Sequence, residues 1–346
     1  MTSNSTLKYS LYIFLWRQGI NLMQIQEVFA AYKTDLLQVG KHLDKYMTSE
    51  VKLIPEVAHH LIDSGGKRFR PLLLLIISRL CGYSGEQRYP MAAAIEFIHT
   101  ATLLHDDVID QATIRRGKTS ANNLWGNAAS VLVGDFLYSK AFKLLAATGN
   151  LDLVKLISQI TNVMSEGEVF QLMKCGDVNI TEEEYLTIIE KKTAVLLSAA
   201  CTAGAILGSA QQDRIDALAQ FGHKIGMAFQ ITDDTLDYMA QEQEFGKSIG
   251  KDLEEGKMTL PLIFDLRSAT KDEKDKTKDL MTGKEDNATV IPLILSLIQK
   301  YKGIDYSLQS AAKYIKDAQA TLHLFKEGPE INQLNAVAQY VLSRRI

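Results

Sequence analysis

The chain has 346 residues, of which 46% are hydrophobic and 23% are charged, and its formal net charge is −3. This composition is typical of a globular protein with a substantial core, and the length predicts one large domain or two ordinary ones. The balanced charge excludes the basic footprint of a nucleic-acid-binding protein. The three cysteines, Cys81, Cys175 and Cys201, match no zinc or disulfide spacing. We therefore expect a reducing, cytoplasmic compartment.

The N-terminal part divides at Met23. Residues 9–16 form an apolar run that is too short to span a bilayer, and no A-x-A-like cleavage site follows it. A clearer amphipathic helical pattern begins at Met23. We predict an N-terminal extension over 1–22, of uncertain role, one folded domain over 23–346, and no transmembrane span.

Apolar residues then recur at three- and four-residue spacing along most of the chain. This pattern predicts helices over 89–109, 128–147, 151–174, 182–209 and 213–240. Thr181 and Glu184 form a capping-box signature at the start of the fourth helix. Strand signals are nearly absent, with no Asn-Gly hairpin. No polar break is rich enough in Pro, Gly or Ser to be a domain linker, so we predict an all-α, single-domain protein.

Two acidic clusters are the most informative feature: His-Asp-Asp-Val-Ile-Asp at 105–110 and Thr-Asp-Asp-Thr-Leu-Asp at 232–237. Each places three aspartates at i, i+1 and i+4, on one turn of a predicted helix. Neighbouring carboxylates repel unless cations neutralise them, and Mg²⁺ takes one or two carboxylates together with water or phosphate oxygens. The alternative, two solvated acidic faces, fits poorly because both clusters lie in apolar sequence. The clusters predict a cavity that holds a metal-bound polyphosphate.

Basic segments alternate with these acidic clusters along the chain. Ser-Gly-Gly-Lys-Arg-Phe-Arg-Pro at 64–71 joins a glycine turn to three cations, without the frame of a P-loop. Arg115 and Arg116 follow the first cluster, Lys191-Lys192-Thr193 lies within a helix, and Gly-Lys pairs follow the second cluster. Each segment alone is also compatible with a solvated loop, an ion pair or a snorkelling lysine. Their order predicts a diphosphate substrate, because arginine and lysine bind phosphate.

In this order the motifs resemble those of the trans-isoprenyl diphosphate synthases, or polyprenyl synthetases, from about residue 40 onward. The matching segments are 106–110 and 233–237 as the two aspartate-rich motifs, Phe229-Gln230, 65–71 as the GGKRxRP segment, and Lys192-Thr193. The resemblance implies an antiparallel helix bundle around a deep central cavity, usually as a homodimer. The domain over 23–346 would then condense an allylic diphosphate with isopentenyl diphosphate.

The resemblance also assigns roles to single residues. The six aspartates would hold about three Mg²⁺ ions: Asp106, Asp110 and Asp233 against the allylic diphosphate, with Asp107, Asp234 and Asp237 in support. The same diphosphate would contact Arg115, Lys192, Thr193, Gln230, Lys247 and Lys257. Isopentenyl diphosphate would bind Lys67, Arg70, His99 and Arg116. The catalytic group would comprise Asp106, Asp110, Lys192, Thr193, Gln230 and Asp233.

Product length should depend on the helix turn before the first aspartates. Thr102 and Ala101, four and five residues before Asp106, lie a little over one turn away, and both are small. In short-chain members of the family an aromatic residue there blocks the tunnel, so the resemblance implies an open gate and a C35–C50 product. Residues 98–105 are most similar to octaprenyl diphosphate synthases, whose product supplies a quinone side chain. Candidates for the tunnel floor are Phe136, Leu137 and Phe142.

Three alternatives stay open at this point. A short-chain (C15–C20) synthase would need a bulky stop elsewhere in the tunnel. Terpene cyclases and head-to-head coupling enzymes share the aspartates but lack the isopentenyl diphosphate residues. A non-catalytic subunit of a heteromeric synthase typically loses aspartates, and all six are present. Farnesyl diphosphate is the expected primer, and transient membrane contact during product release is a further hypothesis.

Overall fold

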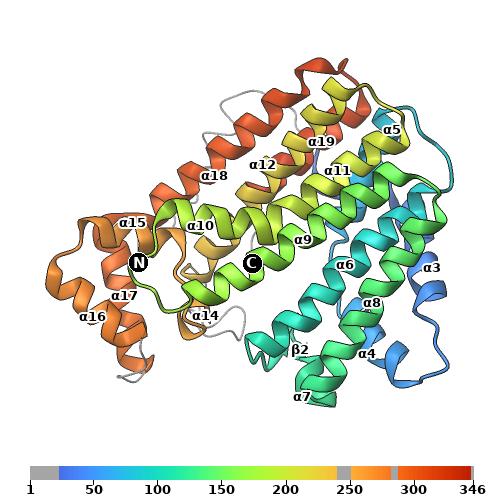
Figure 1. The fold of residues 1–346 in the computed structure, drawn as a ribbon. Coiled ribbons are helices and arrows are strands. Elements are labelled where there is room, and N and C mark those ends of the chain that lie inside the picture. The colour runs from blue at the N-terminus through green and yellow to red at the C-terminus, as the bar shows by residue number, and fades with distance from the viewer. Residues whose placement is uncertain (1–22, 240–250, 282–286, 344–346) are drawn as a thin grey trace.

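The computed structural model describes residues 23–239, 251–281 and 287–343, and in these ranges the chain is almost entirely helical (Figure 1). The first half contains α2 Ile25–Ala31, α3 Lys33–Met47, α4 Leu53–Ile62, α5 Phe69–Leu80, α6 Arg88–Ile109, α7 Ala121–Trp125, α8 Asn127–Ala147 and α9 Leu151–Lys174. The second half contains α10 Glu182–Ile189, the π-helical turn η1 Glu190–Ala194, α11 Val195–Leu207, α12 Gln212–Asp237, α14 Lys251–Glu254, α15 Leu260–Ser268, α16 Lys271–Met281, α17 Asn287–Tyr301, α18 Gly303–Ala320, the 3₁₀ turn η2 Thr321–Leu324 and α19 Pro329–Ser343.

The all-α prediction is confirmed, and several helix limits agree closely. The helix predicted over 151–174 has those bounds, and α6 and α8 each begin one residue earlier than expected. The capping box is present: Thr181 Oγ1 accepts the backbone N–H of Glu184 at 3.2 Å, and a Glu184 carboxylate oxygen accepts that of Thr181 at 2.9 Å. These ends are encoded locally, and for that reason the sequence predicts them well.

Two predicted helices differ from the structure. The segment 182–209 is not one α-helix, because the π turn η1 separates α10 from α11 at 190–194. The helix predicted over 213–240 ends at Asp237, where α12 stops. The charged helix α16, Lys271–Met281, was not among the predicted helices. A π turn adds a residue without changing the apolar pattern greatly, so periodicity does not detect it.

The long helices pack side by side around a single large core. α6 packs on α8, and α12 contacts both α11 and α18. Gly222 and Gly226 allow α12 to approach closely, since a Cβ at Gly222 would lie 2.6 Å from the Leu197 carbonyl oxygen and one at Gly226 would lie 2.4 Å from Ala194 Cα. This close packing brings η1 against the C-terminal half of α12.

A short hairpin follows α6. Strand β1 (Ile114–Arg115) pairs antiparallel with β2 (Lys118–Thr119), with Ile114 opposite Thr119. Arg116 and Gly117 form its turn with φ of 52° and 76°, the positive pair that a type I′ turn requires. An Arg-Gly pair is an uncommon sequence for this turn, which explains why strand signals did not predict it. The hairpin fixes two arginines beside the first aspartate cluster.

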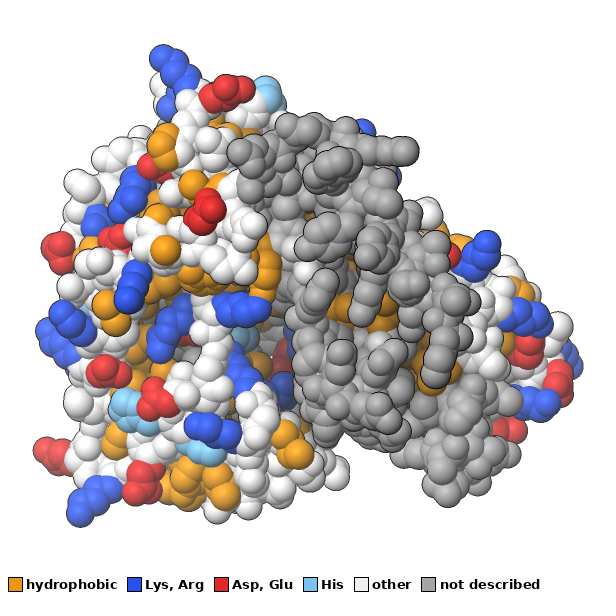
Figure 2. Space-filling model, turned by 180° about the vertical axis from the view of Figure 1, so that it is seen from behind, with side chains coloured by type: hydrophobic (Ala, Val, Ile, Leu, Met, Phe, Trp, Pro, Cys, Tyr) orange, Lys and Arg blue, Asp and Glu red, His pale blue; other side chains and the backbone are white. Residues whose placement is uncertain are grey.

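Surface charge is mixed on the described part of the back face, where Figure 2 shows acidic and basic side chains interspersed. In the described ranges, none of the helices combines the length and the apolar composition that a membrane crossing requires. α15, α16 and α17 gather at one end of the bundle (Figure 1).

Candidate active site

The first aspartate cluster lies at the C-terminal end of α6, and each of its aspartates faces a cation. Lys192 Nζ lies 3.6 Å from an Asp106 carboxylate oxygen, and Lys257 Nζ lies 2.9 Å from one of Asp110. Arg115 contacts Asp107, which is fully buried, through two nitrogens at 2.6 and 2.7 Å. These cations are three of those expected to contact the allylic diphosphate.

The second cluster lies at the C-terminal end of α12, where Asp234 is held by two neutral donors. Tyr185 on α10 donates its hydroxyl to one carboxylate oxygen at 2.6 Å, and the Gln230 amide donates to the other at 2.7 Å. Thr193 on η1 in turn donates to Gln230 Oε1 at 2.8 Å. Burial, together with the charges of Asp233 and Asp237, raises the pKa of Asp234 to about 6 despite these hydrogen bonds.

One cavity of about 110 Å³ adjoins Asp234 of the second cluster and is lined by two lysines that contact the first cluster. Its lining includes five residues that the sequence analysis selected: Lys192, Thr193, Gln230, Asp234 and Lys257. They come from η1, α12 and the segment after α14, and Lys257 also reaches Asp110 on α6. The structure therefore brings segments that are far apart in the sequence into one charged cavity.

Three of the four residues expected to bind isopentenyl diphosphate, Arg70, His99 and Arg116, form a cationic group. Burial lowers the pKa of Arg70 to about 10, with Arg116 lowering it further and the charges of Glu96 and Asp233 opposing. Burial and the charges of Arg70 and Arg116 hold the pKa of His99 well below its usual range. The Nε of Arg70 is buried and has no hydrogen-bond partner among the described residues. Such a concentration of positive charge fits an anionic ligand.

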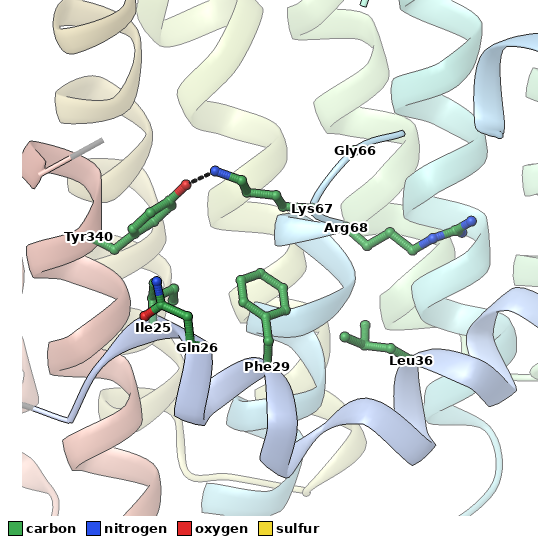
Figure 3. A pocket seen from close by; sticks show the side chains of 8 residues that line it. All are labelled: Ile25, Gln26, Phe29, Leu36, Gly66, Lys67, Arg68 and Tyr340. Atoms are coloured by element: carbon green, nitrogen blue, oxygen red, sulfur yellow. Dashed lines mark hydrogen bonds between the residues drawn. The ribbon is translucent and has the colours of Figure 1, made fainter. Parts of the chain in front are cut away.

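Lys67, the fourth of these residues, is held by a different contact. Its ammonium donates to the hydroxyl of Tyr340 on α19 and lies 4.8 Å from the centre of that ring. Figure 3 shows the two side chains pointing toward each other at a cavity of about 360 Å³, whose apolar lining includes Ile25, Phe29 and Leu36. The neighbouring glycine loop is held from the other side, where Arg116 donates to the Gly65 carbonyl oxygen. The structure thus places Lys67 against the C-terminal helix.

Several side chains at the site were not selected from the sequence. They are Glu96, Glu168, Tyr185, Asp252 and Glu255. Glu168 and Glu255 lie 2.8 and 2.7 Å from Lys192 and Lys257. Burial and the charges of Asp234 and Asp237 raise the pKa of Asp252 well above its ordinary value. The Glu-Gly-Glu sequence at 166–168 was the available signal for Glu168, whereas Tyr185 and Glu96 read as ordinary helix positions. Lys247 lies outside the described residues.

The expected gate residues lie on the helix that carries the first aspartates. Ala101 is fully buried, and Thr102 is partly buried with its hydroxyl donating to the His99 carbonyl oxygen at 2.8 Å. Of the floor candidates on α8, Leu137 is fully buried, whereas Phe136 and Phe142 are partly buried against the core. The gate and the floor stay predictions.

The donor set fits a hard divalent cation bound together with phosphate. Within residues 23–239, 251–281 and 287–343, no three His, Cys, Asp or Glu side chains are close enough to hold a metal by themselves. Mg²⁺ needs only one or two carboxylates when phosphate oxygens complete its coordination. Burial and neighbouring carboxylates raise the pKa values of Asp234 and Asp252, and a bound cation would neutralise this negative charge.

A helical bundle with carboxylates and cations around one cavity has the chemistry that a metal-bound diphosphate requires. The polyprenyl synthetase model matches residues 51–298, and the chain belongs to this family of trans-prenyltransferases. It is 37% identical to octaprenyl diphosphate synthase of Escherichia coli (strain K12) over 94% of this chain and 99% of that protein.

Other relatives of comparable identity make different products. The chain is 36% identical to a geranylgeranyl diphosphate synthase of Sulfolobus acidocaldarius, over 89% of this chain and 96% of that protein. Among solved structures, a polyprenyl synthase from Caulobacter crescentus complexed with calcium and isoprenyl diphosphate matches with a TM-score of 0.90 and 37% identity. It covers 94% of this chain and 100% of that one. The family and the fold agree with the resemblance, while the relatives leave product length open.

Proposed function

We propose that the enzyme condenses an allylic diphosphate, first farnesyl diphosphate, with successive isopentenyl diphosphates. The product would be an all-trans polyprenyl diphosphate of C35–C50, with octaprenyl diphosphate (C40) favoured, used for quinone side chains. The observation that carries this proposal is the charged cavity that Lys192, Gln230, Asp234 and Lys257 line together. Its groups are those that a diphosphate leaving group needs.

The residues of the two clusters have complementary roles in this proposal. When about three Mg²⁺ ions are bound, they neutralise charge that develops on the leaving diphosphate. Asp106, Asp110 and Asp233 would hold them. In the structure, Lys192 contacts Asp106 and Lys257 contacts Asp110. Both lysines would turn to the diphosphate oxygens when the substrate enters. Gln230 and Thr193 would be held near the reacting carbons by their mutual hydrogen bond.

The second substrate would occupy the cationic group of Arg70, His99 and Arg116. Its diphosphate would pair with the two guanidinium groups, and Lys67 would leave Tyr340 to join them. The double bond of isopentenyl diphosphate then attacks the allylic cation, and the departing diphosphate accepts the proton that is lost. Excluding water protects the cation from hydrolysis.

The proposed product length depends on the small side chain at the gate. Ala101 is fully buried on α6 one turn below Asp106, where an aromatic side chain would close the path of a growing chain. The octaprenyl relative supports this length, whereas the geranylgeranyl relative, at similar identity, supports a shorter one. A short-chain (C15–C20) synthase is accordingly the second candidate.

We further propose that the enzyme is a cytoplasmic homodimer that contacts membranes transiently during product release. Large apolar side chains are exposed on the adjoining helices α8 and α9, namely Leu132, Val169, Leu172 and Met173. Contiguous exposed apolar surface is typical of a protein–protein interface. A second copy of the chain is the simplest occupant of this surface.

The test is incubation of the purified protein with Mg²⁺, farnesyl diphosphate and labelled isopentenyl diphosphate, with products separated by chain length. The proposal predicts a dominant product at C35–C50. A dominant product at C20 would keep the chemistry and refute the open gate. Failure to elongate either farnesyl or geranyl diphosphate would favour the alternative that this chain is a non-catalytic subunit of a heteromeric synthase.

A further inference from the structure

Two glutamates on α9 form ion pairs with two consecutive lysines on η1. Glu166 contacts Lys191 and Glu168 contacts Lys192, each with a carboxylate oxygen 2.8 Å from the ammonium nitrogen. Gly167 lies between the glutamates, and a Cβ there would lie 2.6 Å from Lys191 Cβ. α9 runs alongside α10 and α11, which continue into one another through η1 (Figure 1). The Glu-Gly-Glu segment therefore permits the close approach and holds both lysines.

The two ion pairs have different surroundings. The Glu166–Lys191 pair faces outward, with 54% and 31% of the two side chains exposed. The Glu168–Lys192 pair is more buried, at 25% and 23%, and Lys192 also lies 3.6 Å from Asp106. Of these four side chains, only Lys192 lines the charged cavity. The outer pair is a matched control for the inner one.

The π turn explains why Lys192 can reach this cavity. A π turn inserts one residue into the helix and redirects the side chains that follow. Lys192 and Thr193 lie within it, and Thr193 meets Gln230 of α12. The same turn contacts α9, where Gly167 leaves it room. The geometry of Lys192 is thus set from both helices.

We propose that Glu168 is a positioning residue that holds Lys192 for the allylic diphosphate and keeps it from closing on Asp106. This inference rests on the proposed function and names a residue that the sequence motifs leave without a role. Glu168 is not a metal ligand in this proposal, because it acts through the lysine.

The argument follows from the two carboxylates that share one ammonium group. Glu168 lies 2.8 Å and Asp106 lies 3.6 Å from the Lys192 ammonium nitrogen, so both carboxylates attract the same lysine. Without Glu168, the nearest carboxylate would be Asp106, which the proposed function assigns to Mg²⁺. Lys192 would then compete with the metal ion for that carboxylate. With Glu168 in place, Lys192 stays anchored when it leaves Asp106 for the diphosphate.

The test is a double-mutant cycle of Glu168→Ala and Lys192→Ala, measured as kcat/KM for farnesyl diphosphate and as the Mg²⁺ concentration for half-maximal rate. We expect Glu168→Ala to lower kcat/KM by about 10- to 100-fold and to raise the Mg²⁺ requirement, because Lys192 occupies Asp106. In the Lys192→Ala background, Glu168→Ala should change neither quantity further. Glu168→Gln, which retains an acceptor for Lys192, should recover part of the activity.

Controls separate positioning from folding and from the proposed function itself. Glu166→Ala should stay within about twofold of the parent, since its lysine lies outside the cavity. Unchanged binding of farnesyl thiodiphosphate to Glu168→Ala, measured by calorimetry, would overturn the inference. The inference would also be overturned if the fold-losses in kcat/KM of the two single variants multiplied in the double mutant. That result would mean that Glu168 acts independently of Lys192. A parent protein that elongates no substrate would overturn the proposed function as well, and that outcome is distinct from either of these.

Discussion

Lys257 Nζ lies 2.9 Å from an Asp110 carboxylate oxygen, although the two residues are 147 positions apart in the chain. Lys257 comes from the segment that follows the second aspartate cluster, and Asp110 ends the first. A second carboxylate, Glu255, lies 2.7 Å from the same ammonium. Burial lowers the pKa of Lys257, but the carboxylates of Asp110 and Glu255 outweigh this effect and raise the pKa above its ordinary value. The lysine is therefore charged and placed between the two motifs.

Replacing Lys257 should impair the reaction more than the fold. We expect Lys257→Ala to lower kcat by about 10²-fold, because one fixed cation is removed from the leaving diphosphate. Lys257→Arg should retain more activity than Lys257→Ala, since it keeps the charge. Steady-state kinetics with farnesyl and isopentenyl diphosphates would measure both.

The matched control is Lys276→Ala, which removes a lysine from an exposed pair with Asp272 on α16. It should leave kcat within about twofold, because exposed ion pairs contribute little. Equal losses in the two alanine variants would contradict the role given to Lys257.

A bulky residue at the gate should shorten the product. Ala101 has no exposed surface, so a phenylalanine ring there must enter the space beside α6 through which the chain is expected to grow. Ala101→Phe should shift the main product to C15–C20 while the first condensation continues, as shown by chromatography of labelled products. Ala147→Phe, at the exposed end of α8, should leave the length unchanged. An unchanged product ladder in Ala101→Phe would show that the tunnel runs elsewhere.

The buried Asp265 on α15 should make stability depend on pH. Burial raises its pKa to about 7, although the backbone N–H of Gly303 opposes the shift. The folded state therefore disfavours the ionised form, and this destabilisation is absent below the unfolded pKa of 3.8 and grows as pH rises through about 7.

Asp265→Asn should remove that destabilisation. At pH 8 the variant should gain up to about 4 kcal/mol in free energy of unfolding, from the pKa difference at about 1.4 kcal/mol per unit. The gain should shrink toward zero near pH 4. Denaturant titrations at both pH values would measure it, with the exposed Asp272→Asn as control. A gain that is equal at both pH values would refute the electrostatic explanation.

Mg²⁺ and inorganic diphosphate should stabilise the protein cooperatively. The excess negative charge around Asp234 and Asp252 favours a cation, and the lysines released from Asp106 and Asp110 favour the anion. A ligand that binds only the folded state raises Tm. We expect the shift with both ligands to exceed the sum of the separate shifts in a thermal scan, and EDTA to abolish the excess. Additive shifts would mean that the two sites are independent.

The local features of this fold are predictable from sequence, and the interhelical ones are not. The capping box at Thr181 and the helix over 151–174 depend on neighbouring residues, and both match the structure. The π turn at Lys192 occurs where Gly167 of α9 and Gly226 of α12 allow close contact, so its cause lies in other helices. The Arg116-Gly117 hairpin is likewise held by contacts with the loop at Gly65.

The same distinction applies to the site. Residues in recognisable motifs, such as Gln230 and Lys257, were selected because their order along the chain is informative. Glu168 and Tyr185 lie on regular helices, and only the packing of α9 and α10 against the site shows what they contact. Lys67 belongs to a motif, yet its contact with Tyr340 could not be inferred from spacing. A sequence motif predicts which residue types are needed but not which neighbours hold them.

The measurement that tests the central claim most directly compares incorporation of labelled isopentenyl diphosphate by the parent protein, Asp106→Ala and Asp233→Ala, with Mg²⁺ present. If both clusters act on one diphosphate, the parent should elongate farnesyl diphosphate and each variant should lose about 10³-fold or more in rate. Asp272→Ala on the exposed helix α16 should retain the parent rate. Rates within about tenfold of the parent for either cluster variant would contradict the account.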